Sequence, residues 1–382
     1  MESRELEILF SEEFREEVER NLGRDAGSIA LDKRVTNARL VATQVKYLAR
    51  AVKKLPTYYA ARAILPPLAF EQSSSEACAA HKPLGGGLAI DLTCGLGVDT
   101  LYLSKRFERV ISIERNEELA AITRHNLRLM GVENVEVISG SSEEFLEGLT
   151  SADLIYADPD RRSAEGKKMV CLEDCSPNIA ALLPLLREKS NDIVVKLSPM
   201  FDITEALSAF GEGTSVEVIS LGGEVKEVVA HWSRTPRTQT IRATALGSNS
   251  FEVAVEREKC PSAAGFNPEK YGHIIVPDAS LRKAGIVAEW CRAEGYDNFG
   301  AYAFATSKPK EGTMGHIYNM VSAHPWQPKR LKTLVGGRIE VIRHSFPLST
   351  AAICKALGAK EGAGDRWAFA EIEHSMWAFR IE

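Results

Sequence analysis

Short apolar runs alternate with stretches of helical periodicity between residues 86 and 232. Runs of about four to eight residues rich in Val, Ile and Leu indicate buried strands, and apolar residues at every third or fourth position indicate helices. The pattern predicts strands at 88–92, 109–114, 135–138, 153–157, 192–197, 215–221 and 226–232. It predicts helices at about 98–106, 116–130, 142–149, 176–188 and 202–210. This alternation predicts an α/β fold with a mostly parallel sheet covered by helices.

The last two predicted strands are separated only by Gly222-Gly223-Glu224. Parallel neighbours need a crossover connection of about a dozen residues, so this link is too short for a helix. It predicts an antiparallel hairpin at one edge of the sheet. A plain dinucleotide-binding domain has a parallel edge, and the hairpin therefore argues against that interpretation.

The first 80 residues have helical periodicity, most clearly over residues 36–55. Spacings of four and three predict one apolar face in this helix, formed by Val41, Val45, Leu48, Val52 and Leu55. Basic residues lie on the opposite side, namely Arg39, Lys46, Arg50 and Lys53. Residues 26–66 hold eight bases and a single acid, Asp32. The basic side is therefore either a solvated helix face or a surface that contacts a polyanion.

The chain beyond Trp232 mixes further strands and helices. The pattern predicts a hairpin at 238–246 and 251–256, helices at 280–294 and 349–357, and strands at 338–343 and 367–372. A Pro- and Gly-rich stretch at 83–87 precedes the first strand of the α/β region. The strands and the helix beyond residue 316 mark a further region, 316–382.

Length and composition describe an ordinary globular protein with more than one domain. The 382 residues exceed the size of about 250–300 at which single cores stop growing. The formal net charge of -5 gives no overall attraction to nucleic acid. The acidic N-terminus has no apolar signal core, and no apolar run is long enough to cross a membrane. Seven cysteines at spacings that match neither zinc nor redox motifs predict reduced thiols in a cytoplasmic protein without a metal site.

Residues 89–103 carry the first chemical signal, a buried strand that ends at Asp91, a loop through Cys94, Gly95 and Gly97, and a helix. Glycines allow a ligand to approach the backbone closely, and a helix N-terminus favours electronegative groups. Glu114 ends the next predicted strand, where an acidic side chain can accept both hydroxyls of a ribose. This pattern fits NAD as well as S-adenosylmethionine.

The second signal is Asp158-Pro159-Asp160-Arg161-Arg162, which follows the fourth predicted strand. In doubly wound sheets, ligands bind at the carboxyl ends of the strands, and this segment lies at that edge. Proline fixes the turn, while Asp158 or Asp160 could orient a nucleophile through a hydrogen bond. Arg161 and Arg162 could bind phosphates or could pair with nearby carboxylates to hold the loop. Lys196, at the end of the fifth strand, is either a simple strand terminus or a second group at the same edge.

With these features in order, the chain resembles the class I S-adenosylmethionine-dependent methyltransferases. The string Asp-Leu-Thr-Cys-Gly-Leu-Gly-Val-Asp-Thr is similar to a form found in certain RNA methyltransferases. Together with Asp-Pro-Asp-Arg-Arg and Glu-Gln-Ser-Ser-Ser-Glu, it resembles bacterial methyltransferases that carry a C-terminal THUMP-like domain. The resemblance implies a seven-stranded Rossmann-like sheet in 83–262, after an N-terminal helical region in 1–82. It implies a ferredoxin-like piece in 263–315 and a THUMP-like domain in 316–382.

The resemblance also implies roles for particular residues. Asp91, Cys94, Gly95, Gly97, Glu114, Ser141, Ser142 and Asp158 would bind S-adenosylmethionine. Among them Glu114 would hold the ribose and the Ser141–Ser142 turn would flank the adenine, although many relatives have Asp at this turn. The segment 72–76 could close over the cofactor as a lid. The catalytic residues would be Asp158, Pro159, Asp160 and Arg161.

The fourth motif departs from the pattern of enzymes that methylate exocyclic base nitrogens. These enzymes commonly carry Asn/Asp-Pro-Pro-aromatic, whose aromatic ring stacks on a flipped base. In this chain the motif is Asp-Pro-Asp-Arg, so a charged side chain stands where those enzymes have the stacking aromatic ring. The favoured interpretation is a methyltransferase acting on a base of structured RNA, either ribosomal or transfer RNA. The alternatives are a small-molecule or protein acceptor, or a non-catalytic RNA-binding protein; an NAD-dependent dehydrogenase is disfavoured because Thr100 stands at the third glycine position of its fingerprint.

Overall fold

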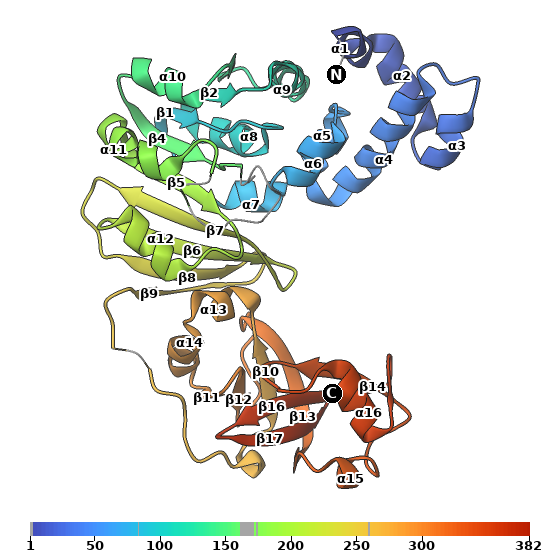
Figure 1. Ribbon diagram of the computed structural model, residues 1–382, viewed down its shortest axis with the longest axis vertical. Coiled ribbons are helices and arrows are strands. Elements are labelled where there is room, and N and C mark those ends of the chain that lie inside the picture. Colours follow the sequence, from blue (N-terminus) through green and yellow to red (C-terminus); the bar gives the residue numbers. More distant parts are fainter. Residues whose placement is uncertain (1–2, 83, 161–171, 173–174, 259) are drawn as a thin grey trace. The chain divides into compact units, whose positions relative to one another are not determined.

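The computed structural model describes residues 3–382, except for 83, 161–171, 173–174 and 259. The chain divides into two compact units (Figure 1). The first contains Met1–Thr214 and Val229–Arg237, and the second contains Ser215–Val228 and Thr238–Glu382. Strand β7 (Glu224–Ser233) is divided between them. Each unit has its own buried core.

Five parallel strands form the centre of the first unit. They are β1 (Gly86–Asp91), β2 (Phe107–Glu114), β3 (Val135–Ser139), β4 (Ala152–Ala157) and β5 (Ser190–Leu197). The strand order is β3-β2-β1-β4-β5-β7-β6-β8-β9. The register places Asp91 beside Ser112 on one side and Tyr156 on the other. Because parallel strands end at the same edge, the loops after β1, β2, β4 and β5 gather there.

Helices connect these strands, as the alternating pattern predicts. They are α8 (Val98–Ser104), α9 (Glu117–Leu129), α10 (Ser142–Gly148), α11 (Ile179–Lys189) and α12 (Ile203–Phe210). In β4 four successive residues from Leu154 to Ala157 are buried, so apolar side chains point to both faces. A strand buried on both faces is typical of a parallel sheet covered by helices. The expected α/β class is confirmed.

The N-terminal helices pack against the sheet unit through one continuous apolar cluster. They are α1 (Ser3–Phe10), α2 (Glu12–Asn21), α3 (Ala26–Leu31), α4 (Ala38–Lys54), α5 (Pro56–Ala61), α6 (Pro67–Gln72) and α7 (Glu76–His81). The buried face of α4 was predicted correctly except at Val52, whose exposed fraction is 49%. At this end of the helix Tyr47 and Ala51 face the core instead. The buried face is therefore rotated relative to the prediction.

The second unit begins with the predicted hairpin. Strand β6 (Thr214–Leu221) and β7 are joined by Gly222 and Gly223, both with positive φ, and a link this short allows only antiparallel pairing. Strand β8 (Thr240–Ala245) pairs parallel with β6 and antiparallel with β9 (Ser250–Ala254). The hairpin expected at 238–256 is thus present, and it extends the sheet from the seven strands expected to nine.

An eight-stranded sheet fills the remainder of the second unit, in the order β11-β12-β10-β13-β17-β16-β14-β15. Its strands are β10 (His273–Pro277), β11 (Asp297–Phe299), β12 (Tyr302–Ala305), β13 (Gly315–Pro325), β14 (Arg338–Arg343), β15 (Lys360–Glu361), β16 (Asp365–Ile372) and β17 (Ser375–Ile381). Its helical elements are η1 (Pro268–Lys270), α13 (Ala279–Ala284), α14 (Val287–Glu294), α15 (Pro328–Leu331) and α16 (Thr350–Leu357). The single helix predicted at 280–294 is wrong, because Gly285 at φ +67° ends α13.

Candidate functional site at the carboxyl edge of the sheet

A buried polar network anchors the loop that follows β1. The side chain of Asp91 accepts hydrogen bonds from the Thr93 backbone N–H at 3.0 Å and the Thr100 hydroxyl at 2.6 Å. The Thr100 hydroxyl also lies 3.0 Å from that of Ser112 on β2. Asp91 is 1% exposed. Both of its oxygens are therefore directed at the protein, where they tie the loop to α8.

Burial raises the pKa of Asp91 from 3.8 to about 7. The hydrogen bonds from Thr100 and Thr93 oppose this shift, whereas the charges of Asp99 and Asp158 add to it. Between about pH 4 and pH 7 the folded protein therefore retains a proton that the unfolded chain has lost. The stability that this proton contributes is present at low pH and is lost as the pH rises through about 7.

We expect Asp91→Asn to weaken this pH dependence, because the amide cannot ionise. In the wild type, this one group should lower the free energy of unfolding by about 3 kcal/mol between pH 5 and pH 8, at about 1.4 kcal/mol per pKa unit. Urea unfolding of both proteins at several pH values measures the difference. Equal pH dependence in the two proteins would contradict the assignment of the buried proton to Asp91.

The two glycines of the loop have different surroundings. Gly97, at φ +81°, lies so close to α9 that an added Cβ would be 2.6 Å from Cγ2 of Thr123. At Gly95, at φ +54°, an added Cβ would meet only the Thr93 carbonyl oxygen, at 3.9 Å. Gly97 therefore permits close packing of the loop on α9, whereas Gly95 leaves open space beside the loop.

Glu114, at the end of β2, holds the same loop from the other side. Its two carboxylate oxygens accept the backbone N–H groups of Gly95 and Asn116, both at 2.8 Å. Each oxygen of a carboxylate has a second lone-pair position, so Glu114 can accept further hydrogen bonds. The side chain is half-buried. Glu114 thus lies beside the open space at Gly95, where the ribose contact was expected.

The turn after β3 completes this part of the edge. The Gly140 N–H donates to the carbonyl of Glu114 at 3.1 Å, and the buried Ser142 hydroxyl donates to the carbonyl of Leu92. The Ser141 hydroxyl oxygen accepts from the Glu144 N–H and caps α10. An added Cβ on Gly140 would meet nothing within 4 Å. The turn therefore lies next to Glu114 and is open at Gly140.

Cys94 lies in the first loop, but its side chain faces the interior. The thiol is 3.7 Å from the Thr100 hydroxyl, and burial raises its pKa well above the ordinary value. Its backbone N–H donates to Ile113 and its carbonyl accepts from Gly97. Cys94 therefore shapes the loop through its backbone.

Asp158 lies at the same edge, at the end of β4. Its backbone N–H donates to the Thr93 hydroxyl at 2.6 Å, which joins this turn to the loop after β1. Its Oδ2 accepts a hydrogen bond from the Lys196 ammonium at 2.5 Å. Among the described residues Oδ1 has no partner, and the side chain is 26% exposed. Asp158 therefore keeps one oxygen in an ion pair and one available at the edge.

Lys196 also links Asp158 to the segment before β1. Its ammonium donates to the Ser74 hydroxyl at 2.9 Å, and Ser74 in turn donates to Asp99 at 2.7 Å. Lys82 forms an ion pair with the other oxygen of Asp99. Burial opposes ionisation of Asp99, but the charges of Lys82 and Lys196 keep its pKa below the ordinary value. This connected set joins the lid segment proposed at 72–76 to the carboxyl edge.

The residues after Asp158 are described only in part. Pro159 is buried, and Asp160 exchanges two backbone hydrogen bonds of 2.9 Å with Ser176. The Arg115 guanidinium donates to the Ser176 hydroxyl at 2.8 Å. Arg161 and Arg162 lie outside the described residues.

Sequence reasoning named the loop glycines, Glu114 and Asp158, and the structure brings them to one edge. It did not name Thr93, Asp99 or Lys82 as members of the site, and it included Ser74 only within the lid segment 72–76. Lys196 was considered mainly as a strand terminus, yet its side chain is only 11% exposed and is ion-paired. The sequence did carry a signal for this ion pair, namely a lysine at the end of an apolar strand. A lysine is rarely buried unless it is paired.

Comparison with known proteins identifies the fold that carries this edge. A family model described as RNA cap guanine-N2 methyltransferase matches residues 86–160, and one described as THUMP domain-like matches residues 315–382. A crystal structure assigned as a methyltransferase from Porphyromonas gingivalis W83 superimposes with a TM-score of 0.84 at 23% identity. The superposition covers 100% of this chain and 98% of that one. The chain has a class I methyltransferase fold followed by a THUMP-like domain.

Two curated relatives match smaller parts of the chain. An uncharacterised S-adenosylmethionine-dependent methyltransferase of Mycobacterium tuberculosis H37Rv is 30% identical over 224 residues, which are 58% of this chain and 59% of that protein. A tRNA/tmRNA (uracil-C(5))-methyltransferase of Neisseria meningitidis is 39% identical over 74 residues, 19% of this chain and 20% of that protein. The chain thus spans well under two thirds of either relative's length.

Two further properties of the described residues concern membranes and metal ions. None of the described helices combines the length and the hydrophobicity needed to span a membrane. The described part of the chain contains no group of three or more His, Cys, Asp or Glu side chains placed to hold a metal ion.

Proposed function

We propose that this protein is an S-adenosylmethionine-dependent methyltransferase that transfers a methyl group to a base of structured RNA, ribosomal or transfer RNA. The observation that carries the proposal is the meeting of two features at one sheet edge. One is the open space beside the loop at Gly95, next to the carboxylate of Glu114. The other is the half-buried carboxylate of Asp158, joined to that loop through Thr93. A cofactor site and a polar acceptor site are thereby adjacent.

The residues of the first loop fit the proposed cofactor. The open space at Gly95 and Gly140 allows a ligand to approach the backbone, and Glu114 has lone pairs for the two ribose hydroxyls. Ser141 and Ser142 would flank the adenine through their backbone, since the hydroxyl of each already serves the protein. Asp91 and Cys94 would act indirectly, by fixing the loop, and Gly97 by packing it on α9.

When bound, S-adenosylmethionine would supply a methyl group on a positively charged sulfur. The protein would contribute mainly alignment, since this displacement needs little acid–base assistance. Oδ1 of Asp158 would accept a hydrogen bond from the N–H of the acceptor and orient its lone pair. Lys196 would hold Oδ2 of Asp158 in the ion pair and leave Oδ1 to face the acceptor. Pro159 and Asp160 would fix the turn, and Arg161 would bind a phosphate of the substrate.

Several observations support RNA as the substrate. The family model over residues 86–160 is described by an RNA activity, and the relatives of the chain include a tRNA/tmRNA methyltransferase. The chain also carries a THUMP-like domain. We propose the boundaries 1–82, 83–262, 263–315 and 316–382 for its helical, methyltransferase, ferredoxin-like and THUMP-like regions. We place the protein in the cytoplasm, an inference supported by free thiols at all six described cysteines.

A small-molecule or protein acceptor is the second candidate. The observation that favours it is the Asp158-Pro159-Asp160 turn, which lacks the aromatic residue that stacks on a flipped base. The charged side chains of this turn can bind a polar acceptor of any size. The overall charge of -5 points in the same direction.

Calorimetric titration with S-adenosylmethionine and with NAD tests the cofactor assignment directly. We expect binding of S-adenosylmethionine alone, and a loss of at least tenfold in affinity in Glu114→Gln, whose amide cannot accept at both of its terminal atoms. The matched control is Glu136→Gln on β3, an exposed carboxylate paired with Arg109. Tight binding of NAD, or an unchanged affinity in Glu114→Gln, would contradict the proposed site.

We expect Lys196→Met to reduce methyl transfer by at least tenfold and to lower the thermal midpoint of unfolding. Methionine retains much of the volume but leaves Asp158 without its cation, and a broken buried ion pair is costly. Lys196→Arg should restore part of the activity, since it keeps the charge. The readouts are single-turnover transfer per folded protein and a thermal melt; an unchanged rate of transfer by folded Lys196→Met would leave the lysine a purely structural role.

A further inference from the structure

We propose that the basic face of α4, formed by Arg39, Lys46 and Lys53, binds the phosphate backbone of the RNA substrate. The inference deepens the proposed function and rests on it. Helix α4 contains no acidic residue, and these three side chains are exposed. Their spacing of seven residues and seven residues places them on one side of the helix. At 1.5 Å per residue they extend over about 21 Å.

The charges of this basic face are not neutralised by the protein. Among the described residues, Arg39, Lys46 and Lys53 have no acidic partner within ion-pair distance. Lys46 lies only over the ring of the neighbouring Tyr47, 5.8 Å from its centroid. An uncompensated row of cations is the electrostatic feature that attracts a polyanion.

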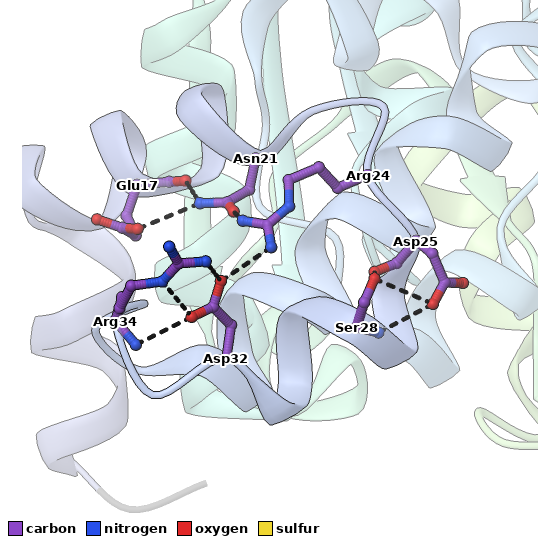
Figure 2. A network of polar contacts seen from close by, with 7 residues as sticks. All are labelled: Glu17, Asn21, Arg24, Asp25, Ser28, Asp32 and Arg34. Atoms are coloured by element: carbon purple, nitrogen blue, oxygen red, sulfur yellow. Dashed lines mark hydrogen bonds and ion pairs between the residues drawn. The ribbon is translucent and has the colours of Figure 1, made fainter.

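Several other bases of the N-terminal helices are paired with acids, unlike the three that form the basic face. Figure 2 shows Asp32 accepting hydrogen bonds from both Arg24 and Arg34. Arg20 forms ion pairs with Glu16 and Glu17 on α2. Residues 1–25 hold nine acids, yet none of their described ion pairs reaches the basic face. The three cations of the basic face therefore remain without acidic partners although the N-terminal residues are rich in acids.

Helix α4 is also connected to the carboxyl edge of the sheet. Arg50 forms an ion pair with Glu71, and the Lys54 ammonium donates to the carbonyl oxygens of Phe70 and Glu71 at the end of α6. Three residues beyond Glu71, Ser74 bonds to Lys196, the partner of Asp158. The basic face therefore belongs to the same packed unit as the acceptor site. The link from α4 to Asp158 runs through the end of α6, Ser74 and Lys196.

The proposal is tested by the salt dependence of RNA binding. The variant Arg39→Gln/Lys46→Gln/Lys53→Gln and the wild type are titrated with bulk transfer RNA and bulk ribosomal RNA at 50 to 200 mM salt. Each lost phosphate contact reduces the slope of log affinity against log salt by about 0.7. We expect a slope smaller by about 2, so that between 50 and 200 mM the wild type loses about twentyfold more affinity than the variant.

A matched variant removes three bases that are paired with acids in the same unit, Arg20→Gln/Arg34→Gln/Arg109→Gln. It has the same change in net charge, and its slope should equal that of the wild type. Affinity for S-adenosylmethionine should be unchanged in both variants, which shows that each has folded.

Three outcomes would overturn the proposal. If the wild type methylates RNA but both triple variants bind with the wild-type slope, the basic face is not a docking surface and the proposed function stands. If the wild type has no salt-dependent affinity for either RNA, the RNA assignment fails as well. If the Arg39, Lys46 and Lys53 variant loses binding only to vesicles of phosphatidylserine and phosphatidylcholine, the face binds a membrane surface instead.

Discussion

Asp158→Ala is expected to reduce methyl transfer to the acceptor by at least about 100-fold, the usual scale for a positioned polar group. The affinity for S-adenosylmethionine should fall by less than about tenfold. The turn survives this change because its backbone N–H still donates to the Thr93 hydroxyl. The change removes Oδ1, which has no described partner and is free to meet the acceptor, together with Oδ2, the partner of Lys196. Single-turnover transfer and calorimetry measure the two quantities separately.

Asp153→Ala is the matched control, since Asp153 lies on the same strand at the amino edge of the sheet. Its carboxylate accepts the backbone N–H groups of Gly87 and Leu88 at 2.8 and 2.9 Å. The loss of these bonds should affect stability and leave the rate of transfer by folded protein unchanged. Equal losses of activity in Asp158→Ala and Asp153→Ala would mean that Asp158 acts only through the fold.

Gly97→Asp is expected to abolish measurable binding of S-adenosylmethionine and to destabilise the protein. The reason is steric, because any Cβ at this position would meet Cγ2 of Thr123 at 2.6 Å. The positive φ of +81° adds about 1–2 kcal/mol of backbone strain for a residue other than glycine. The loop that carries Gly95 would have to move away from α9. Calorimetry and urea unfolding measure the two effects.

Two further variants separate the collision from the strain. Gly131→Ala, at φ +71° with nothing within 4 Å, carries strain alone and should leave cofactor affinity unchanged. Thr123→Ser removes Cγ2 and keeps the hydroxyl that donates to the Gly95 carbonyl at 2.8 Å. The double variant Thr123→Ser/Gly97→Ala should therefore bind S-adenosylmethionine more tightly than the single variant Gly97→Ala. No recovery in the double variant would show that Gly97 contacts the cofactor directly.

The strands and the edge that they form could be predicted from sequence because apolar periodicity is local. An apolar run such as Ile193–Leu197 predicts a buried strand from its own residues alone. The same reasoning places Asp91, Glu114 and Asp158 at the ends of neighbouring strands. Their convergence then follows from the rule that parallel strands end at one edge.

The polar network could not be predicted, because its contacts join residues far apart in sequence. Ser74 and Lys196 are separated by 122 positions, and no periodicity relates them. The role of Gly97 was hidden for the same reason, since its constraint comes from Thr123 on another helix. The sequence pattern also missed the break at Gly285, where an apolar periodicity continues across a left-handed residue.

The central claim is methyl transfer at the carboxyl edge to RNA, and the most direct measurement is transfer of tritium. The full chain is incubated with S-adenosylmethionine labelled in the methyl group and total RNA from cells that lack this gene, with Asp158→Ala in parallel. We expect label in one size class of RNA with the wild type and at least 100-fold less with the variant. Cofactor binding by calorimetry without label in any RNA would contradict the RNA assignment and would direct the search to protein and small-molecule acceptors.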